Sequence, residues 1–279
     1  MNSFLNLELP GAHGRPVVTD LYLPAELGSF PLVIFCHGFK GFKSWGFYDY
    51  LPEAFCNEGL AFLRFNFSHN GTNAQIPDAF VEPEAFGSNT IGKELDDLQT
   101  ILNSLKELPQ SGNFNMNAIY LAGHSRGGGI ALLSAARDKR IKKLALWNSV
   151  SDWNIFMSQF DRERWKEDGV AYIRNSRTGE DLPVGYKLYT DYDANREIYH
   201  LGNAAESLEI PLLLVHGTED KNVHIDASEY FYNKVFHAIF IKVEGGDHTF
   251  GIRHPWTEEQ EGVPAFAEAL SNTIDFFLD

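Results

Sequence analysis

The stretch at residues 121–129 reads Leu-Ala-Gly-His-Ser-Arg-Gly-Gly-Gly, and it decides how the rest of the chain is interpreted. It follows an apolar run at residues 118–120 and precedes a run rich in alanine and leucine at residues 130–136. A buried strand, a Gly-x-Ser-x-Gly turn and a helix in this order are typical of a nucleophile elbow, in which a sharp turn raises a serine hydroxyl above the sheet. We therefore predict that Ser125 is a nucleophile. The alternative is a glycine-rich turn that only packs a helix on a sheet.

The small residues around Ser125 fit this interpretation. A serine at such a turn has a strained backbone, and side chains at Gly123 and Gly127 would collide with the neighbouring strand or helix. The N-terminus of the following helix also directs free backbone N–H groups towards any negative charge that develops near the serine. The local sequence thus favours a nucleophile beside a group of anion-stabilising donors.

The composition bounds the possible functions. With 279 residues, of which 44% are hydrophobic and 22% charged, the chain is typical of a globular protein with a sizeable core. Its formal net charge of −15 argues against nucleic acids and anionic membranes as partners, because their phosphates would be repelled. No basic run and no zinc-type cysteine spacing offsets that charge, so we expect a small-molecule substrate.

The two cysteines and the N-terminus bear on the cellular compartment. Cys36 ends a strand-like run and Cys56 lies in a helix-like run, so both are predicted to be buried thiols, while a disulfide between them stays open. Residues 1–8 have neither the basic region nor the continuous apolar region of a secretory signal, and no stretch is long enough to span a bilayer. We expect a soluble, cytoplasmic protein.

Apolar runs alternate with helical patterns along most of the chain. Residues 4–9 and 17–23 alternate apolar and polar side chains, which predicts an antiparallel pair at a sheet edge. Further strands are expected at 31–36, 61–67, 118–122, 144–147, 211–215 and 238–243, and helices at 48–58, 91–108, 130–136, 227–235 and 264–278. This order predicts an α/β fold with a mainly parallel central sheet and helices on both faces.

The alternation stops between residues 149 and 206. This segment is rich in aromatic and charged residues without a long regular period, and the strand pattern resumes at residue 211. We therefore predict a single domain over residues 1–279 with a small cap-like insertion at 149–206. Some of its aromatic side chains, Trp153 and Trp165 included, are expected to anchor the insertion to the body of the domain. We hypothesise that the remainder line an apolar pocket above Ser125.

A serine nucleophile needs a base and a group that orients the base. In open parallel sheets the chemistry gathers at the carboxyl ends of the strands, which favours His248, directly after the last strand, with His254 as the second candidate. Two carboxylates, Glu219 and Asp220, follow the preceding strand. We predict that Asp220 orients His248, and Glu219 stays a rival because either carboxylate can accept an imidazole N–H. The alternatives are a structural histidine and a solvated turn residue.

An acyl-transfer site also needs donors for the oxyanion. The backbone N–H of Arg126, the residue after the nucleophile, is one candidate, and the N–H of Phe39, in the loop after the strand at 31–36, is the other. His37 in the same loop is interpreted as structural. Two roles stay open for the Arg126 side chain, namely a surface salt bridge and a contact with a substrate carboxylate.

These motifs together resemble the α/β-hydrolase superfamily. They are His-Gly-Phe at 37–39, Gly-His-Ser-Arg-Gly at 123–127, His-Gly-Thr-Glu-Asp at 216–220 and Gly-Asp-His at 246–248, and they follow the superfamily's order over nearly the whole chain. The chain looks most like dienelactone-hydrolase-like and feruloyl-esterase-like serine hydrolases, and is also similar to the catalytic domain of prolyl-oligopeptidase-type peptidases. It differs from true dienelactone hydrolases, which have a cysteine where this chain has Ser125.

The resemblance implies a serine esterase. Ser125, His248 and Asp220 would form a catalytic triad, the N–H groups of Phe39 and Arg126 would bind the oxyanion, and no metal or organic cofactor would be needed. The expected reaction is cleavage of carboxylic esters, with an apolar or aromatic substrate, through an acyl-enzyme. A peptidase or amidase is the nearest alternative. A non-catalytic binding protein on a hydrolase scaffold is the alternative from another functional class.

Overall fold

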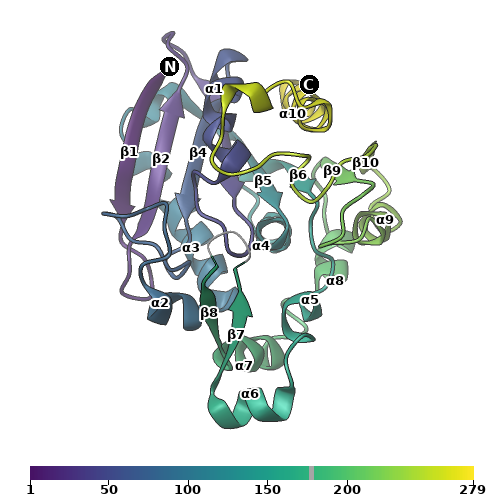
Figure 1. Ribbon diagram of the computed structural model, residues 1–279. Coiled ribbons are helices and arrows are strands. Elements are labelled where there is room, and N and C mark those ends of the chain that lie inside the picture. Colours follow the sequence, from purple (N-terminus) through teal and green to yellow (C-terminus); the bar gives the residue numbers. More distant parts are fainter. Residues whose placement is uncertain (176–178) are drawn as a thin grey trace.

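The computed structural model describes residues 1–175 and 179–279, and a central sheet of eight strands organises them (Figure 1). The order across this sheet is β1 (Asn2–Leu9), β2 (Val17–Leu23), β4 (Ala61–Asn66), β3 (Phe30–Cys36), β5 (Phe114–His124), β6 (Ile141–Trp147), β9 (Leu212–Gly217) and β10 (Ile239–Val243). β2 pairs antiparallel with both β1 and β4, and the other neighbouring pairs are parallel. The predicted mainly parallel sheet with an antiparallel N-terminal edge is confirmed.

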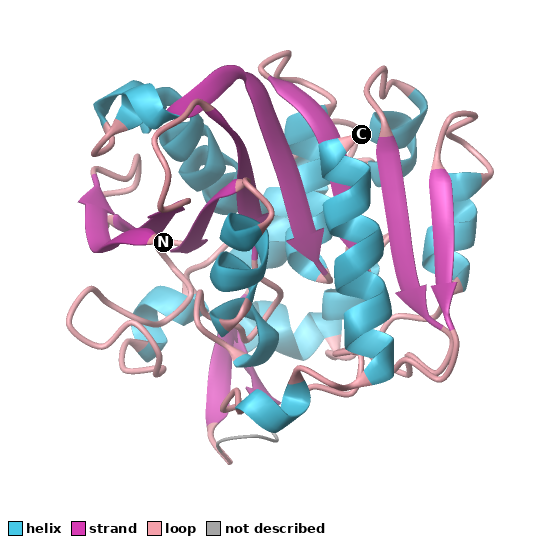
Figure 2. Ribbon diagram, turned by 90° about the horizontal axis from the view of Figure 1, so that it is seen from above, coloured by secondary structure: helices cyan, strands magenta, loops and turns pink. Residues whose placement is uncertain are grey.

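Helices cover both faces of the sheet, as predicted (Figure 2). One face packs against α3 (Ile91–Ser104), α4 (Arg126–Ala135), α8 (Leu201–Glu206) and α9 (Asp226–Tyr232), and the other against α1 (Leu51–Asn57) and α10 (Pro264–Leu278). Outside residues 149–206, the described connections also hold the short helix α2 (Pro83–Gly87) and the 3₁₀ turns η1 (Gly46–Asp49), η2 (Leu105–Glu107), η3 (Ser111–Asn113) and η4 (Glu258–Gln260).

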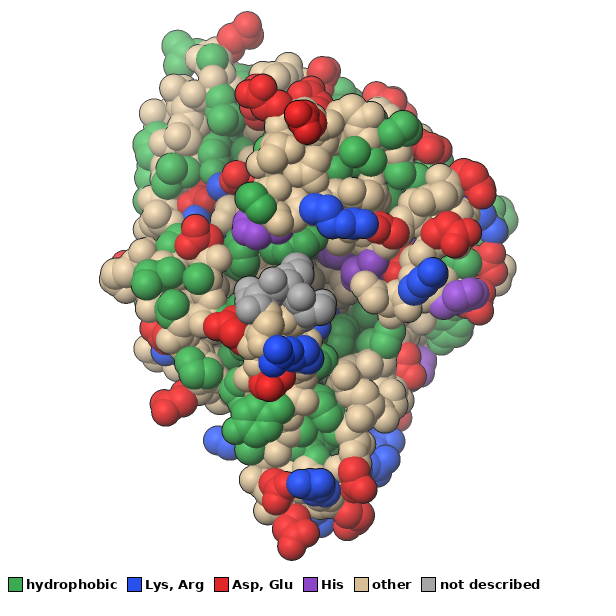
Figure 3. All heavy atoms as spheres, in the orientation of Figure 1, with side chains coloured by type: hydrophobic (Ala, Val, Ile, Leu, Met, Phe, Trp, Pro, Cys, Tyr) green, Lys and Arg blue, Asp and Glu red, His purple; other side chains and the backbone are tan. Residues whose placement is uncertain are grey.

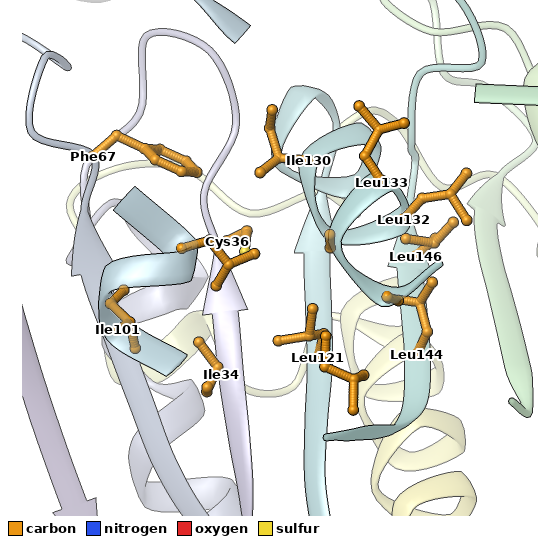
Figure 4. Packing of buried hydrophobic residues seen from close by; sticks show 14 of the residues in the cluster. Ile34, Cys36, Phe67, Ile101, Leu121, Ile130, Leu132, Leu133, Leu144 and Leu146 are labelled. Carbon is orange, nitrogen blue, oxygen red and sulfur yellow. The ribbon is translucent and has the colours of Figure 1, made fainter. Parts of the chain in front are cut away.

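Alternation along the central strands produces a hydrophobic core on each face. In β3, Leu32 and Ile34 belong to the cluster beneath α3 and α4, whereas Val33 and Phe35 belong to the cluster beneath α1 and α10. Successive side chains of a strand point to opposite faces, so a strand that is apolar at every position must be covered on both sides. Figure 4 shows part of the first cluster, with side chains of β3, β5 and β6 beside those of α3 and α4.

The structure moves several predicted boundaries. β5 begins at Phe114 rather than near residue 118, and the helix predicted at 48–58 consists of η1 followed by α1. The helix predicted at 91–108 is α3 continued by η2. α3 begins after Thr90, whose hydroxyl accepts the backbone N–H of Lys93 at 3.3 Å, as expected of an N-cap.

The segment 149–206 lies outside the central sheet, and in Figure 1 much of it projects from the lower end of the molecule. It holds α5 (Asn154–Met157), α6 (Arg162–Asp168), α7 (Lys187–Ala194), α8 and an antiparallel hairpin of β7 (Val170–Arg174) and β8 (Asp181–Gly185), which the sequence pattern did not predict. Residues 176–178 of the predicted insertion lie outside the described residues. Trp153 and Trp165 are each 2% exposed, and their indole N–H groups donate to the Tyr199 and Val184 carbonyl oxygens at 2.8 and 2.7 Å, both inside the insertion. Trp153 also packs on Arg126 and Gly129 of α4 and so anchors the insertion to the body, whereas the ring contacts of Trp165 lie within the insertion.

Two smaller predictions concern the thiols and membrane spans. Cys36 and Cys56 are both buried and free, which confirms the prediction of buried thiols and excludes the disulfide left open above. Among the helices that the structure describes, none combines the length and the apolar character needed to cross a membrane.

Candidate active site

Ser125 is the single residue between β5 and α4. Its φ of +55° and ψ of −120° lie where side chains are strained, and its N–H donates to the carbonyl oxygen of Trp147, the last residue of β6, at 2.9 Å. The hydrogen bond to β6 holds this turn against the sheet. Ser125 is thus fixed in the sharp strand-to-helix turn that the sequence predicted.

The glycines around Ser125 are required by close backbone contacts. A Cβ at Gly123 would lie 2.5 Å from the carbonyl oxygen of Gly127, and a Cβ at Gly127 would lie 2.3 Å from that of Cys36 in β3. Both distances are far shorter than a van der Waals contact, so no other residue fits at either position without backbone movement. The predicted collisions are therefore present in the structure.

The structure brings His248 and Asp220 together. Asp220 follows β9 and His248 follows β10, and the His248 Nδ1 lies 2.7 Å from the Asp220 Oδ2. The other carboxylate oxygen of Asp220, Oδ1, accepts the backbone N–H groups of Asn222 at 2.8 Å and Val223 at 3.0 Å. The carboxylate is therefore held in one orientation by its own loop, with Oδ2 turned to the imidazole.

The electrostatics of Asp220 decide the tautomer of His248. Burial by itself would raise the pKa of Asp220, but hydrogen bonds from His216, His248 and the Val223 N–H outweigh burial and hold this pKa well below its usual value. An ionised carboxylate only accepts, so the His248 Nδ1 carries the hydrogen and Nε2 is left as a proton acceptor.

The rival candidates, Glu219 for the acid and His254 for the base, do not form a comparable pair. Glu219 is exposed, and its side chain has no hydrogen bond or ion pair with any residue that the structure describes. His254 accepts the backbone N–H of Gly46 at 3.1 Å and stacks on the Trp45 ring at 6.2 Å between centroids. Of the two carboxylates and two histidines considered, the structure pairs Asp220 with His248.

Ser125, His248 and Phe39 line one cavity of about 520 Å³. The loop that carries Phe39 touches the elbow, since a Cβ at Gly38 would lie 3.2 Å from the Ser125 Cβ. His37 in this loop has its Nδ1 2.9 Å from the Gly38 oxygen, and its Nε2 accepts the Phe67 N–H at 3.4 Å. Burial lowers the pKa of His37 to about 4, so a neutral, structural histidine fits the prediction made for it.

His124, the residue before Ser125, links the elbow to the loop of His248. Its Nε2–H donates to the His248 carbonyl oxygen at 2.7 Å, and the Tyr48 hydroxyl donates to its Nδ1 at 2.7 Å. Burial and the neighbouring His248 lower the pKa of His124 to about 3, so its ring stays neutral. Sequence reasoning missed this residue, although its place inside the Gly-x-Ser motif was the available signal.

Asn148, directly after β6, was also missed. Its Oδ1 accepts the Gly217 N–H at 2.8 Å, at the end of β9, and its Nδ2 donates to the His248 carbonyl oxygen at 3.0 Å. The side chain is fully buried, so water does not compete for these hydrogen bonds. One amide therefore connects the loops that carry Asp220 and His248.

The Arg126 side chain is neither a surface salt bridge nor an open contact for substrate. It is buried, and its Nε donates to Glu94 Oε2 at 2.8 Å and Oε1 at 3.0 Å. Its guanidinium carbon lies 5.6 Å from the Phe39 ring, 5.8 Å from Trp153 and 5.2 Å from Phe156. The surface position expected from sequence is wrong, because the aromatic rings of the insertion cover this charge and Glu94 of α3 compensates it.

We expect Glu94→Gln to lower the free energy of unfolding by about 3 kcal/mol, because it leaves the buried Arg126 without a counter-charge. Adding Arg126→Met to this variant should restore part of the loss, since the uncompensated charge is then gone. Urea unfolding of the single and double variants measures both effects. The exposed Glu107→Gln in η2 is the matched control, with a change within about 0.5 kcal/mol. An equally small change for Glu94→Gln would contradict the prediction.

The hypothesis that the aromatics of the insertion line the pocket needs correction. The described insertion residues that line the cavity are Ile155, Phe156, Gln159, Ile173 and Asn175, of which only Phe156 is aromatic. Apart from the exposed Tyr172, the other aromatic side chains pack within the insertion, against the body or around a neighbouring cavity of about 680 Å³. The insertion therefore contributes a mixed surface to the cavity, because amides lie beside its apolar groups.

Comparison with known proteins identifies the family. The sequence profile of the prolyl oligopeptidase family matches residues 87–244, which is more than half of the chain. The chain belongs to the prolyl oligopeptidase family. The region that matches this family contains Ser125 and Asp220 and ends just before His248. A comparison with curated proteins gives no match.

Solved structures similar to this prolyl oligopeptidase family member show its fold. Est1E from Butyrivibrio proteoclasticus with bound ferulic acid has 21% identity over 98% of this chain and 99% of its own, with a TM-score of 0.73. The dienelactone hydrolase from Anabaena variabilis has 16% identity over 99% and 97% of the two chains, with a TM-score of 0.63. A puromycin-hydrolyzing peptidase of Mycobacterium tuberculosis has 18% identity over 97% of this chain and 38% of its own, with a TM-score of 0.66. These likenesses confirm the predicted α/β-hydrolase fold.

Proposed function

We propose that this chain is a serine hydrolase that cleaves carboxylic esters through an acyl-enzyme. The observation that carries the proposal is the 2.7 Å contact between His248 and Asp220 at the cavity that Ser125 lines. A strained serine before a helix N-terminus, an imidazole with a free Nε2 and an ionised carboxylate are the three groups that nucleophilic acyl transfer requires.

Ser125 is the nucleophile in this mechanism. Its Oγ attacks the ester carbonyl carbon as its proton passes to the His248 Nε2, and Asp220 stabilises the imidazolium through Nδ1. The N–H groups of Phe39 and Arg126 donate to the oxyanion of the tetrahedral intermediate. His248 then gives the proton to the leaving alcohol, which yields the acyl-enzyme. Water, activated by the same imidazole, attacks the acyl group and releases the acid and the free serine.

The segment 149–206 acts as a cap in this proposal, within one domain that spans residues 1–279. Five of its described residues line the cavity together with Ser125 and His248, and the rings of Trp153 and Phe156 lie over the Arg126 guanidinium. A cap fixed in this way limits the size of the acyl or alcohol group and lowers the local dielectric around the reacting carbonyl.

Peptide or amide cleavage is the second candidate, because the chain belongs to the prolyl oligopeptidase family and a puromycin-hydrolyzing peptidase shares its fold. The same triad can cleave esters and amides, so the two activities differ in whether the enzyme expels an alcohol or an amine as the leaving group. A non-catalytic binding protein on this scaffold would not need a His248–Asp220 pair and a strained Ser125 at one cavity.

A matched panel of 4-nitrophenyl esters and 4-nitroanilides with the same acyl groups separates these possibilities. We expect kcat/KM for the esters to exceed that for the anilides by about 100-fold or more, since the ester is the easier acyl donor and no dedicated amine site is invoked. Equal or higher kcat/KM for the anilides would assign the chain to the amidases. No turnover and no acyl-enzyme burst with either series would favour the binding protein.

A further inference from the structure

Among the described residues that line the candidate active-site cavity, the charged side chains other than the histidine are all basic. Apart from the histidine, the described residues that line it include three charged ones, Lys40, Lys221 and Arg253, and no aspartate or glutamate. The chain as a whole has the opposite balance, with 23 lysines and arginines against 38 aspartates and glutamates. The overall composition therefore does not account for a group of cations at this cavity, and a function of the cavity itself is the explanation to consider.

Three separate loops supply these cations. Lys40 follows β3, Lys221 follows β9 and Arg253 lies beyond β10, so each stands on the carboxyl side of a parallel strand, where the triad also lies. Figure 3 shows blue Lys and Arg side chains and purple histidines on this face, with red Asp and Glu side chains among them. Their convergence arises from the folded arrangement and not from a basic run in the sequence.

The three charges are compensated to different degrees. The Arg253 Nη1 lies 3.1 Å from the Asp247 Oδ2, and the Lys40 Nζ donates to the Arg174 carbonyl oxygen at 3.4 Å. Lys221 is exposed and has no ion pair or hydrogen bond with any described residue. Its charge is therefore the one most available to a ligand. Glu219 and Asp247 do not line the cavity, but they line a neighbouring depression together with Lys221, His248 and Arg253.

The backbone at Lys40 adds an independent observation. Lys40 lies in a turn closed by the hydrogen bond from the Gly41 N–H to the Gly38 oxygen at 3.1 Å, and its φ is +57°. Such a φ favours glycine or asparagine, so a lysine here is strained. Strained backbone positions cluster at ligand sites, where the role of the side chain outweighs the energetic cost of the backbone conformation.

The remaining residues that line the cavity include both apolar side chains and amides. Phe39, Phe156 and Val223 offer apolar surface, whereas Gln159 and Asn222 offer amide donors. We infer that the cavity selects esters that carry a carboxylate, with Lys221 and Lys40, supported by Arg253, binding that anion and the apolar side chains contacting the rest of the substrate. This inference rests on the proposed esterase function and adds the substrate class to it.

Two matched substrate pairs test the inference. 4-Nitrophenyl hydrogen adipate against 4-nitrophenyl methyl adipate places the charge on the acyl side, and 4-acetoxybenzoate against its methyl ester places it on the alcohol side. We expect the wild-type protein to prefer the anionic member of at least one pair by about fivefold in kcat/KM, the scale of one partly exposed ion pair. Added salt at about 0.5 M should reduce that preference, because it screens exposed charges.

Variants identify the charge responsible. Lys221→Gln should lower the preference, which is kcat/KM for the anionic member divided by kcat/KM for the neutral member, about threefold to fivefold, and Lys221→Glu should lower it further. Lys166→Gln, an exposed lysine of α6 that does not line the cavity, is the control for total charge and should leave the preference unchanged. The same preference in the wild-type protein and Lys221→Gln, or an equal loss in Lys166→Gln, would overturn the inference.

A binding measurement separates this inference from the proposed function. Calorimetric titration with 4-hydroxybenzoate and with 4-hydroxybenzamide needs no hydrolysis. Tighter binding of the carboxylate that is lost in Lys221→Gln supports the anion site even if no ester is turned over, in which case the esterase proposal alone fails. Turnover of neutral and anionic esters at equal kcat/KM, with equal binding of acid and amide, leaves the esterase proposal standing and refutes the anion site.

Discussion

Ser125→Ala is expected to lose about 10⁴-fold or more in kcat on aryl esters, the scale seen when a triad nucleophile is removed. The loss follows from the missing Oγ, because the elbow backbone, its hydrogen bond to Trp147 and the His248–Asp220 pair do not depend on that atom. Steady-state kinetics measure the loss, and labelling by a fluorophosphonate followed by peptide mapping identifies the residue. Labelling that persists in Ser125→Ala would remove Ser125 from the mechanism.

Ser125→Gly is the matched control for folding. The φ of +55° strains serine and alanine alike, whereas glycine adopts it readily. We expect Ser125→Gly to be as inactive as Ser125→Ala but about 1 kcal/mol more stable, by urea unfolding. This combination distinguishes lost chemistry from a lost fold. Equal stability of the two variants would show that the serine backbone is not strained.

Asp220→Asn is expected to cost about 10⁴-fold in kcat, while Glu219→Gln should change it by less than about twofold. The structure gives the reason. The backbone N–H groups of Asn222 and Val223 both point at the Asp220 Oδ1, so they hold an oxygen there, and the amide nitrogen of the variant must face His248. That nitrogen donates to the His248 Nδ1 and moves the ring proton to Nε2, where it blocks proton transfer from Ser125.

Glu219→Gln serves as the control because Glu219 is exposed and adjacent in sequence. Circular dichroism and urea unfolding should report the same fold for both variants. The reverse order of activity, with Glu219→Gln the more damaged variant, would transfer the role of orienting the imidazole to Glu219.

The body of the fold was predictable because its strands carry strong patterns. β3 is apolar at nearly every position, so its burial on both faces follows from strand geometry. β2 alternates, yet all seven of its residues are buried, because its Asp20 pairs with Lys43 and Arg64. The insertion was not predictable in the same way. β7 and β8 have five residues each, and their burial depends on packing against α2 and other short elements, which no local period encodes.

The residues of the candidate site were predictable where a local strand pattern marks them and not where their partners are distant in the sequence. Ser125, Asp220 and His248 were predicted because each follows a recognisable strand, and chemistry gathers at the carboxyl ends of such strands. His124, Asn148 and Glu94 were missed because their partners lie far away in the sequence. The burial of the Arg126 charge was missed for the same reason, since its counter-charge comes from α3 and its aromatic cover from the insertion.

The hydrogen bonds around Asn148 determine which parts of this molecule are free to change in evolution. Trp147 accepts the N–H of Ser125, and the next residue, Asn148, binds the loops of both Asp220 and His248. The turn of the proposed nucleophile and the segments that carry the proposed acid and base are thus all hydrogen-bonded to two consecutive residues at the end of one central strand. The tips of the surrounding loops are then free to lengthen, shorten or acquire new side chains without moving the reacting atoms relative to one another. This anchoring explains in physical terms how one reaction centre can be fitted with different substrate pockets.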